Sequence, residues 1–228
     1  MRWRTVKKAI LIPIKDPANA KTRLATLLTP EERSRLASAM FEDVSGAVVQ
    51  VNNAECIAVV TSYQHAINHA GARGWTVLEE ARQTSESESV DRACEELKQR
   101  GFDFVLRLPA DIPLVLGEDI DALLGVELRT PGALIVPSRD GTGTNALART
   151  PPDLFPSRFG PDSFAIHHRE ATRSGAQVLV LENGRIAIDV DEPADVELVL
   201  RLPPVSRTQA LLLEMKVGAR LNRRNISS

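Results

Sequence analysis

Aspartates stand at two places in the sequence where carboxylates could hold a metal ion. Asp111 follows the apolar, β-rich segment 102–108, which is predicted to form a buried strand that Pro109 ends. A carboxylate at the carboxyl end of a central strand lies where open α/β sheets bind ligands. It would suit Mg²⁺ beneath a nucleotide polyphosphate, since Mg²⁺ prefers one or two carboxylates plus phosphate oxygens. The alternative is that Asp111 only caps the following turn, and this stretch alone does not decide between them.

Asp189 and Asp191 form the second acidic place, within segment 186–193. On an extended chain alternate residues share a face, so the two carboxylates are expected to point the same way. Two like charges that close are costly unless a cation or hydrogen-bond donors lie between them. A solvent-facing pair would avoid that cost, so the pattern is compatible with a cation site without requiring one.

Three basic residues, Lys15, Lys21 and Arg23, lie in one loop after a predicted first strand at 9–14. Lysine offers a point charge and arginine a planar fork, and both suit phosphate. A solvated basic loop is the alternative, and it is favoured when the loop is taken alone. The sequence contains no Walker A motif and no G-x-G-x-x-G, so two common nucleotide-binding patterns are absent.

Two later segments could also approach a ligand. The glycines of 140–145 allow close backbone approach, although a tight turn between strands explains them equally well. Segment 159–164 opens a helix, where free backbone N–H groups beside Gly160 and Ser163 would suit a phosphate. A helix capped by Asp162 or Ser163 is an equally good local explanation.

The order of elements predicts an α/β domain with a mostly parallel central sheet flanked by helices. Thr29 and Glu32 form a capping box that begins a long helix, and a later helix is expected to start near Ser87 or Ser89. The basic loop, Asp111, the Gly-Thr loop and the aspartate pair would then reach one crevice at the strand ends. The predicted strands are 9–14, 57–61, 75–78, 102–108 and 133–136.

Composition excludes several classes of protein. With 28 basic and 30 acidic residues, the overall charge favours neither nucleic acid nor a membrane surface as partner, and no apolar run is long enough to span a bilayer. Cys56 and Cys94 stand far apart without a C-x-x-C pattern, which predicts a reducing compartment and no zinc site. The basic start followed by 9–14 mimics a signal peptide, but the run is too short and lacks a cleavage site. A cytoplasmic protein is expected.

The chain is predicted to divide into a main domain, 1–204, and an appendage, 205–228. The appendage is expected to hold an amphipathic helix at 208–220 and a basic tail at 220–224. The helix would pack on the domain or form a homodimer, and the tail would be a frayed, solvated end.

Six short motifs, taken in order, are more specific than any one of them. The set resembles the 2-phospho-L-lactate guanylyltransferase family, which includes the phosphoenolpyruvate guanylyltransferases of bacteria. The resemblance covers about residues 9 to 200 and implies a Rossmann-like nucleotidyltransferase domain and a part in coenzyme F-420 biosynthesis. The motifs are Pro13-x-Lys15, Ala20-Lys21-Thr22-Arg23-Leu24, Pro109-Ala110-Asp111-Ile112-Pro113-Leu114, Gly141-Thr142-Gly143-Thr144-Asn145, Phe159-Gly160-Pro161-Asp162-Ser163 and Asp189-Val190-Asp191-x-Pro193.

Carried over by position, the resemblance implies three groups of site residues. The implied Mg²⁺ ligands are Asp111, Asp189 and Asp191. The residues implied to seat the phospho-acid are Thr144, Gly160 and Ser163. The loop residues expected to hold the GTP phosphates in catalysis are Lys15, Lys21 and Arg23.

One departure from the family concerns the mid-chain helix that lines its pocket. Members usually show a Leu-Asn pair at the start of this helix, where this chain has Glu88-Ser89-Val90-Asp91. A more polar lining at Glu88 and Ser89 would tolerate an acceptor with a free hydroxyl, such as 3-phospho-D-glycerate. This hypothesis rests on those two residues alone.

The implied reaction joins GMP from GTP to a phosphorylated three-carbon acid and releases pyrophosphate, with Mg²⁺ as cofactor. The acid would be 3-phospho-D-glycerate, phosphoenolpyruvate or 2-phospho-L-lactate, and the labile product could pass directly to the next enzyme of the pathway. One rival is another nucleotidyltransferase of the same fold, acting on a sugar phosphate or molybdopterin. The other is a non-catalytic nucleotide-binding protein.

Overall fold

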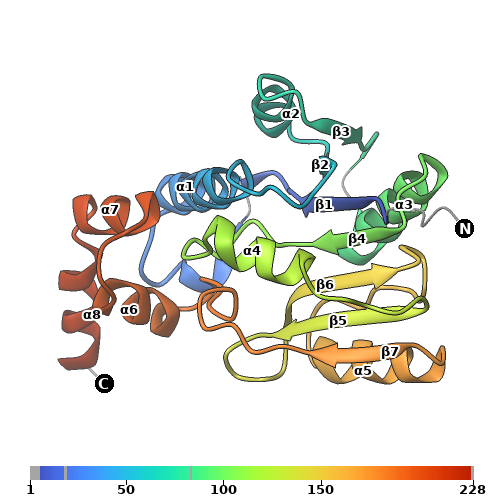
Figure 1. The fold of residues 1–228 in the computed structure, drawn as a ribbon. Coiled ribbons are helices and arrows are strands. Elements are labelled where there is room, and N and C mark those ends of the chain that lie inside the picture. Colours follow the sequence, from blue (N-terminus) through green and yellow to red (C-terminus); the bar gives the residue numbers. More distant parts are fainter. Residues whose placement is uncertain (1–5, 18–19, 83, 227–228) are drawn as a thin grey trace, which may run out of the picture.

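Seven strands form one sheet in the order β3-β2-β1-β4-β6-β5-β7 (Figure 1). The structure is a computed structural model and describes residues 6–17, 20–82 and 84–226. Residues 1–5 and the side chains beyond residue 222 lie outside the described residues, and most of the predicted basic start and tail falls there. The expectation of a solvated tail from residue 220 is wrong for Arg220 itself, which is partly buried and pairs with Glu32 (2.7 Å). The predicted α/β class with a mostly parallel sheet is confirmed.

The five predicted strands are present, and two more join them. Strand β1 pairs in parallel with β2 and β4, β2 with β3, and β5 with β7. Strand β6 is antiparallel to both of its neighbours, β4 and β5. The strands are β1 (Lys8–Pro13), β2 (Cys56–Thr61), β3 (Thr76–Glu79), β4 (Phe104–Arg107), β5 (Gly132–Pro137), β6 (Thr144–Thr150) and β7 (Gln177–Val180).

Helices cover both faces of the sheet, because its central strands are apolar on both sides. Helices α1 (Pro30–Val48), α2 (Gln64–Gly71) and α4 (Gly117–Leu124) pack on one face over Ile10, Ile12 and Phe104. Helices α3 (Glu86–Gln99) and α5 (Ser163–Arg173) cover the other face. The predicted capping box at Thr29 begins α1, and a second one at Ser85 begins α3.

The last three helices gather beside α1 at one end of the sheet (Figure 1). They are α6 (Pro193–Arg201), α7 (Arg207–Glu214) and α8 (Val217–Ile226). The single helix expected at 208–220 is wrong, because Lys216 takes a left-handed conformation (φ 54°) and separates α7 from α8. Leu212 and Val217 share one hydrophobic cluster with Leu36 of α1. The division into 1–204 and 205–228 stays a prediction.

The direction of β6 decides which loops meet. Because β6 is reversed, its first residues, Thr144 and Asn145, lie at the same sheet edge as the carboxyl ends of β1, β4 and β5. The loop after β4 carries Asp111 to this edge. Its backbone carbonyl accepts a hydrogen bond from Val190 N–H (3.1 Å), which brings the second aspartate segment alongside. No helix in the described ranges is long and apolar enough to cross a membrane.

Candidate active site

A crevice opens at this edge and has two connected halves. The first, of about 250 Å³, is lined by Lys15, Lys21 and Tyr63 with residues of α1, and is called the Tyr63 half below. The second, of about 540 Å³, is lined by Thr144 and Ser163, among others, and is called the Thr144 half. The residues that line both halves are Glu86, Arg107, Pro109, Asp111 and Asp191.

A buried lysine stands at the junction of the two halves. Lys21 Nζ donates to Asp111 Oδ2 (2.6 Å) and to Asp191 Oδ1 (2.5 Å). Burial lowers the pKa of Lys21, but the two carboxylates outweigh burial and the pKa is raised. Burial raises the pKa of Asp111, but the charge and hydrogen bond of Lys21 lower this pKa by a larger amount. The pKa of Asp111 therefore lies below its usual value. Lys21 and Asp111 are therefore charged at neutral pH.

Asp189 completes the acidic group from the neighbouring turn. Its Oδ1 accepts a hydrogen bond from Asn145 Nδ2 (3.0 Å) at the start of β6. Burial and then the charge of Asp111 raise the pKa of Asp189. The negative charge of Asp111 disfavours ionisation of Asp189, so a cation bound beside both carboxylates would stabilise their charged forms.

The three predicted metal ligands thus come together with a lysine among them. Among the described residues no three His, Cys, Asp or Glu side chains are arranged to hold a metal ion. The Lys21 ammonium bridges Asp111 and Asp191. The donors are all carboxylate oxygens, and phosphate oxygens would add to them. This chemistry fits Mg²⁺, which needs few protein ligands when phosphates are present.

Thr144 is supported from beneath by a buried histidine. Arg158 N–H donates to His167 Nε2 (2.8 Å), so the ring proton is on Nδ1, which donates to Thr144 Oγ1 (3.0 Å). Burial, reinforced by the charges of Arg149 and Arg107, lowers the pKa of His167 to about 3. The neutral ring leaves the Thr144 hydroxyl free to donate its own proton.

Gly160 and Ser163 lie beside Thr144 in the same half of the crevice. The free N–H groups expected at the start of α5 are partly used, because Ser163 N–H bonds to the Gly160 carbonyl (3.2 Å) and Phe164 N–H to the Thr142 carbonyl (3.0 Å). Asp162 occupies the N-cap position, and its side chain makes no capping hydrogen bond. Fewer backbone N–H groups are therefore free to bind a phosphate here than at an open helix N-terminus.

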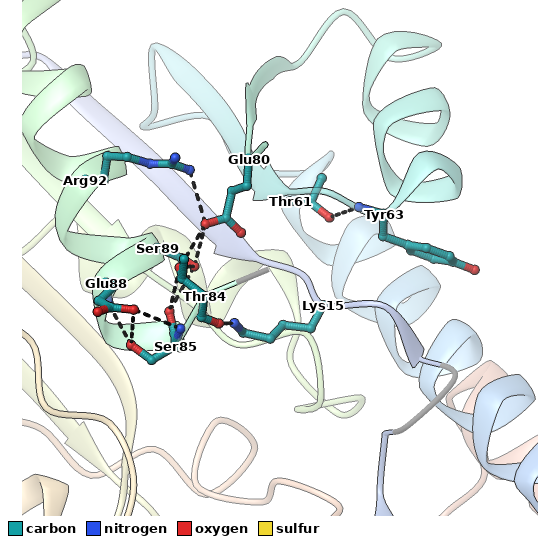
Figure 2. Close-up of polar contacts among 9 residues, drawn as sticks. All are labelled: Lys15, Thr61, Tyr63, Glu80, Thr84, Ser85, Glu88, Ser89 and Arg92. Carbon is teal, nitrogen blue, oxygen red and sulfur yellow. Dashed lines mark hydrogen bonds and ion pairs between the residues drawn. The ribbon is translucent and has the colours of Figure 1, made fainter. Parts of the chain in front are cut away.

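The other two loop cations point to different places. Lys15 Nζ donates to the carbonyl of Thr84 at the rim of the Tyr63 half (Figure 2). Arg23 is exposed, pairs with Glu192 (3.2 Å) and lines the Thr144 half. Of the three predicted cations, Lys21 contacts the aspartates directly, and the other two flank them.

The residues behind the acceptor hypothesis, Glu88 and Ser89, turn away from the crevice. Glu88 closes the capping box with Ser85, and Ser89 Oγ donates to the buried Glu80 carboxylate (2.7 Å), as Figure 2 shows. Neither residue lines either half. The expectation that they make the lining more polar is wrong. The residue of α3 that lines the crevice is Glu86.

Sequence reasoning missed Arg107, the last residue of β4. It is 5% exposed, its Nη1 donates to the Thr144 carbonyl (3.2 Å), and its Nη2 pairs with Glu86. Its guanidinium lies over the Phe159 ring, 4.1 Å from the centroid. A basic residue inside an otherwise apolar strand, two positions before Pro109, was the signal available.

Comparison with known proteins agrees with this geometry. The sequence matches the family described as "Guanylyl transferase CofC like" over residues 8–218. The chain belongs to this family. The match extends past the range of about 9 to 200 that the motifs covered.

Relatives of this chain have names that give different acceptors. The phosphoenolpyruvate guanylyltransferase of Sphaerobacter thermophilus is 32% identical, over 86% of this chain and 93% of its own. The 2-phospho-L-lactate guanylyltransferase of Methanothermobacter thermautotrophicus is 31% identical, over 86% and 85%. The 3-phospho-D-glycerate guanylyltransferase of Colwellia psychrerythraea is 32% identical, over 85% and 91%. Their similar identities do not single out one acceptor.

Solved structures support the fold. A Desulfovibrio desulfuricans G20 protein assigned as a nucleotide-diphospho-sugar transferase has a TM-score of 0.75 at 21% identity, covering 96% of this chain and 98% of its own. A nucleotidyl transferase from Methanothermobacter has a TM-score of 0.60 at 16% identity, covering 86% and 96%. At these identities the likeness concerns the Rossmann-like nucleotidyltransferase fold.

Proposed function

We propose that the protein transfers GMP from GTP to a phosphorylated three-carbon acid and releases pyrophosphate. The observation that carries the proposal is the two-part crevice with Lys21, Asp111 and Asp191 at the junction of its halves. Relatives of this chain named as guanylyltransferases of phosphoenolpyruvate, 2-phospho-L-lactate and 3-phospho-D-glycerate support it. Their acceptors share a phosphate and a carboxylate.

The two halves suit the two substrates. Small and apolar residues from the end of β1, the loop after it and α1 line part of the Tyr63 half, which would take the nucleoside. The Thr144 half offers a hydroxyl, backbone groups and charged side chains, and it would take the phospho-acid. The nucleotide α-phosphate and the acceptor phosphate would then meet at the junction.

The chemistry requires positioning more than proton transfer. A phosphate monoester has a second pKa of about 6, so the attacking oxygen is already an anion near neutral pH and needs no general base. Lys21 would stabilise negative charge at the junction, and Lys15 and Arg23 would hold the departing pyrophosphate. Thr144, with its oxygen fixed by His167, would donate to the acid.

Asp111, Asp189 and Asp191 would hold Mg²⁺, which when bound supplies positive charge to phosphate oxygens. Lys21 now donates to two of these carboxylates, and its long side chain would shift its donors to phosphate oxygens as substrates enter. Asn145 would keep Asp189 oriented during this exchange.

The wider setting follows from the proposed reaction. A guanylylated phospho-acid is the precursor expected for coenzyme F-420, and the cytoplasm is where GTP would be available. Homodimer formation and hand-over of the product to the next enzyme stay predictions.

The deciding experiment measures pyrophosphate release. The protein is incubated with GTP, Mg²⁺ and each of phosphoenolpyruvate, 2-phospho-L-lactate and 3-phospho-D-glycerate in turn. Release with one of these acids, and none without an acid, is the expected result. Silence with all three in protein that still binds GTP would overturn the proposal and favour a sugar-phosphate or pterin transferase, or a binding protein.

A further inference from the structure

Arg107 has an incomplete set of partners. Its Nε is buried and has no hydrogen-bond partner, although buried guanidinium nitrogens are normally satisfied. The side chain is 6% exposed and lines both halves of the crevice. An unsatisfied donor at the wall of a ligand crevice indicates that part of its hydrogen bonding is left for a ligand.

The charge partner of Arg107 belongs to the crevice as well. Glu86, in the first turn of α3, lines both halves, and its side chain is 33% exposed. It therefore stands between Arg107 and the open space. A carboxylate in this position occupies a guanidinium that could equally bind the carboxylate of a small molecule.

Arg107 is held independently of Glu86. Its Nη1 bonds to the backbone carbonyl of Thr144, and its plane lies on the Phe159 ring. Thr144 and Phe159, which make these two contacts, both line the Thr144 half. The guanidinium would thus keep its place if Glu86 moved aside.

The other cations that line the Thr144 half are less suited to this task. Arg23 and Arg139 have side chains that are 66% and 55% exposed, and each is paired with an acidic residue at the rim. Solvent screens such charges, whereas a buried arginine contributes a stronger, geometrically fixed contact. Among the described residues that line this half, Arg107 is the buried cation.

We propose that Arg107 binds the carboxylate of the acceptor acid, in exchange for the carboxylate of Glu86. The proposal rests on the proposed function, because it assumes an acceptor with a phosphate and a carboxylate. The phosphate must reach the aspartates and Lys21 to react. Arg107 contacts Thr144 and Phe159, which line only the Thr144 half, so the carboxylate is the end that lies toward Arg107. Glu86 pairs with the guanidinium until the acid arrives, and then competes with the acid for it.

The first test separates the two substrates. With the acid that gives the most pyrophosphate release, Arg107→Gln raises the KM for the acid by about 10- to 100-fold, the range for a lost charged hydrogen bond. The KM for GTP changes by less than about threefold, since the nucleotide makes no use of the contact. Arg107→Lys, which keeps the charge and loses the planar fork, gives an intermediate increase.

The second test uses a variant of Glu86, for which the KM for the acid is expected to change in the opposite direction. Glu86→Gln removes the competing anion, and the KM for the acid falls by about three- to tenfold. If Glu86 only kept the Arg107 side chain in position, Glu86→Gln would raise the KM for the acid, as Arg107→Gln does. An increase would overturn the exchange. This variant also keeps the test open should Arg107→Gln fail to fold.

A third test identifies which end of the acid Arg107 contacts. Glycerol 3-phosphate has the phosphate and lacks the carboxylate, so its inhibition constant changes by less than about twofold in Arg107→Gln. Equal weakening of glycerol 3-phosphate and the acid would overturn the assignment to the carboxylate.

A matched control is Arg149→Gln. Arg149 is also buried and also pairs with an acidic residue of α3, but it lines neither half of the crevice. This variant leaves the KM for the acid unchanged. Absence of turnover in the unmodified protein with all three acids would count against the proposed function, whereas turnover with an unchanged acid KM in Arg107→Gln would overturn the present inference alone.

Discussion

Helix α3 makes ion pairs with two buried arginines on the same face of the sheet, and the two pairs differ in what surrounds them. Arg107 of β4 pairs with Glu86, and Arg149 of β6 pairs with Asp91 (3.1 Å). Arg149 is the register partner of Val105, two residues before Arg107, so the two arginines are near neighbours. Each also lies near a phenylalanine ring, Phe159 at 4.1 Å and Phe155 at 5.5 Å.

The difference lies in how completely each arginine is hydrogen-bonded and in whether it reaches the crevice. Arg149 also donates to the Phe155 carbonyl and to Cys94 Sγ (3.2 Å), while Asp91 accepts from Ser157 N–H (2.9 Å). Arg107 keeps a buried nitrogen without a partner and reaches the crevice. An arginine–carboxylate pair therefore fixes structure where the arginine is fully hydrogen-bonded, and it is open to exchange where the arginine lines a ligand crevice.

The largest break in this comparison is expected at Asp111, which follows Arg107 into the crevice. Asp111→Asn is expected to lower kcat by about 1,000-fold or more, because it removes a charge at the junction where phosphate must be held. The fold should remain, and circular dichroism with a urea denaturation curve checks this. An Asn variant with near-normal turnover would contradict the role assigned to the aspartates.

The Arg149–Asp91 pair is expected to act on stability instead. Arg149→Met removes the charged hydrogen bonds that the buried Arg149 makes to the half-buried Asp91 and to the Phe155 carbonyl, which is expected to cost about 1.5–3 kcal/mol of unfolding free energy. Urea denaturation measures the loss, and steady-state kinetics on the folded protein should show an acid KM within about threefold of the original. A selective rise in that KM would erase the distinction between the two pairs.

His167 lies between the two regions, with ring contacts to Phe159 (5.0 Å) and Phe155 (6.2 Å). Burial lowers its pKa to about 3, below the value of about 6.5 expected in the unfolded chain. Between these values the unfolded state binds a proton that the folded state does not, so stability falls as the pH is lowered. The expected loss from this residue between pH 6.5 and 4.5 is on the order of 2 kcal/mol.

The measurement is urea denaturation at both pH values, compared with His167→Gln, which cannot titrate. The difference between the two pH values should be smaller in the variant by that amount. Equal differences in both proteins would mean that His167 is not held neutral by burial.

The smallest effect is expected at an exposed ion pair near the opposite end of α3. Lys98 Nζ and Asp153 Oδ2 are 2.6 Å apart, with side chains 47% and 39% exposed. Lys98→Gln is expected to lower unfolding free energy by less than about 1 kcal/mol, since solvent screens the pair. Thermal denaturation and the acid KM should both be nearly unchanged. A large loss would show that exposure is a poor guide to what these pairs do.

Local signals predicted much of the fold. The capping box at Thr29, the stop at Pro109 and the apolar strands are properties of neighbouring residues, and they were placed correctly. Strand β6 was missed because Asn145 and Arg149 interrupt its apolar pattern. Both are buried and satisfied by partners far away in the sequence, such as Asp189 and Asp91.

The candidate site was likewise predicted only where local sequence signals exist. The predicted aspartates meet in one crevice, as expected of loops at strand ends. The placement of Lys21 between two of them depends on contacts across 90 and 170 residues, which no periodicity reveals. Glu88 was taken for a lining residue because the corresponding helix lines the pocket in the family. In this chain Glu86, in the first turn of α3, takes that position.

The reversal of β6 also bears on how such an enzyme can diversify. Strands β5 and β6 form a hairpin whose connecting segment, 138–143, lies in the Thr144 half. A hairpin register is set locally by its turn, so this segment can change length or sequence while the parallel strands that position Asp111 keep their pairing. In a family whose members are named for three acceptors, the hairpin is a place where selection, or a protein engineer, could exchange the acceptor without rebuilding the sheet.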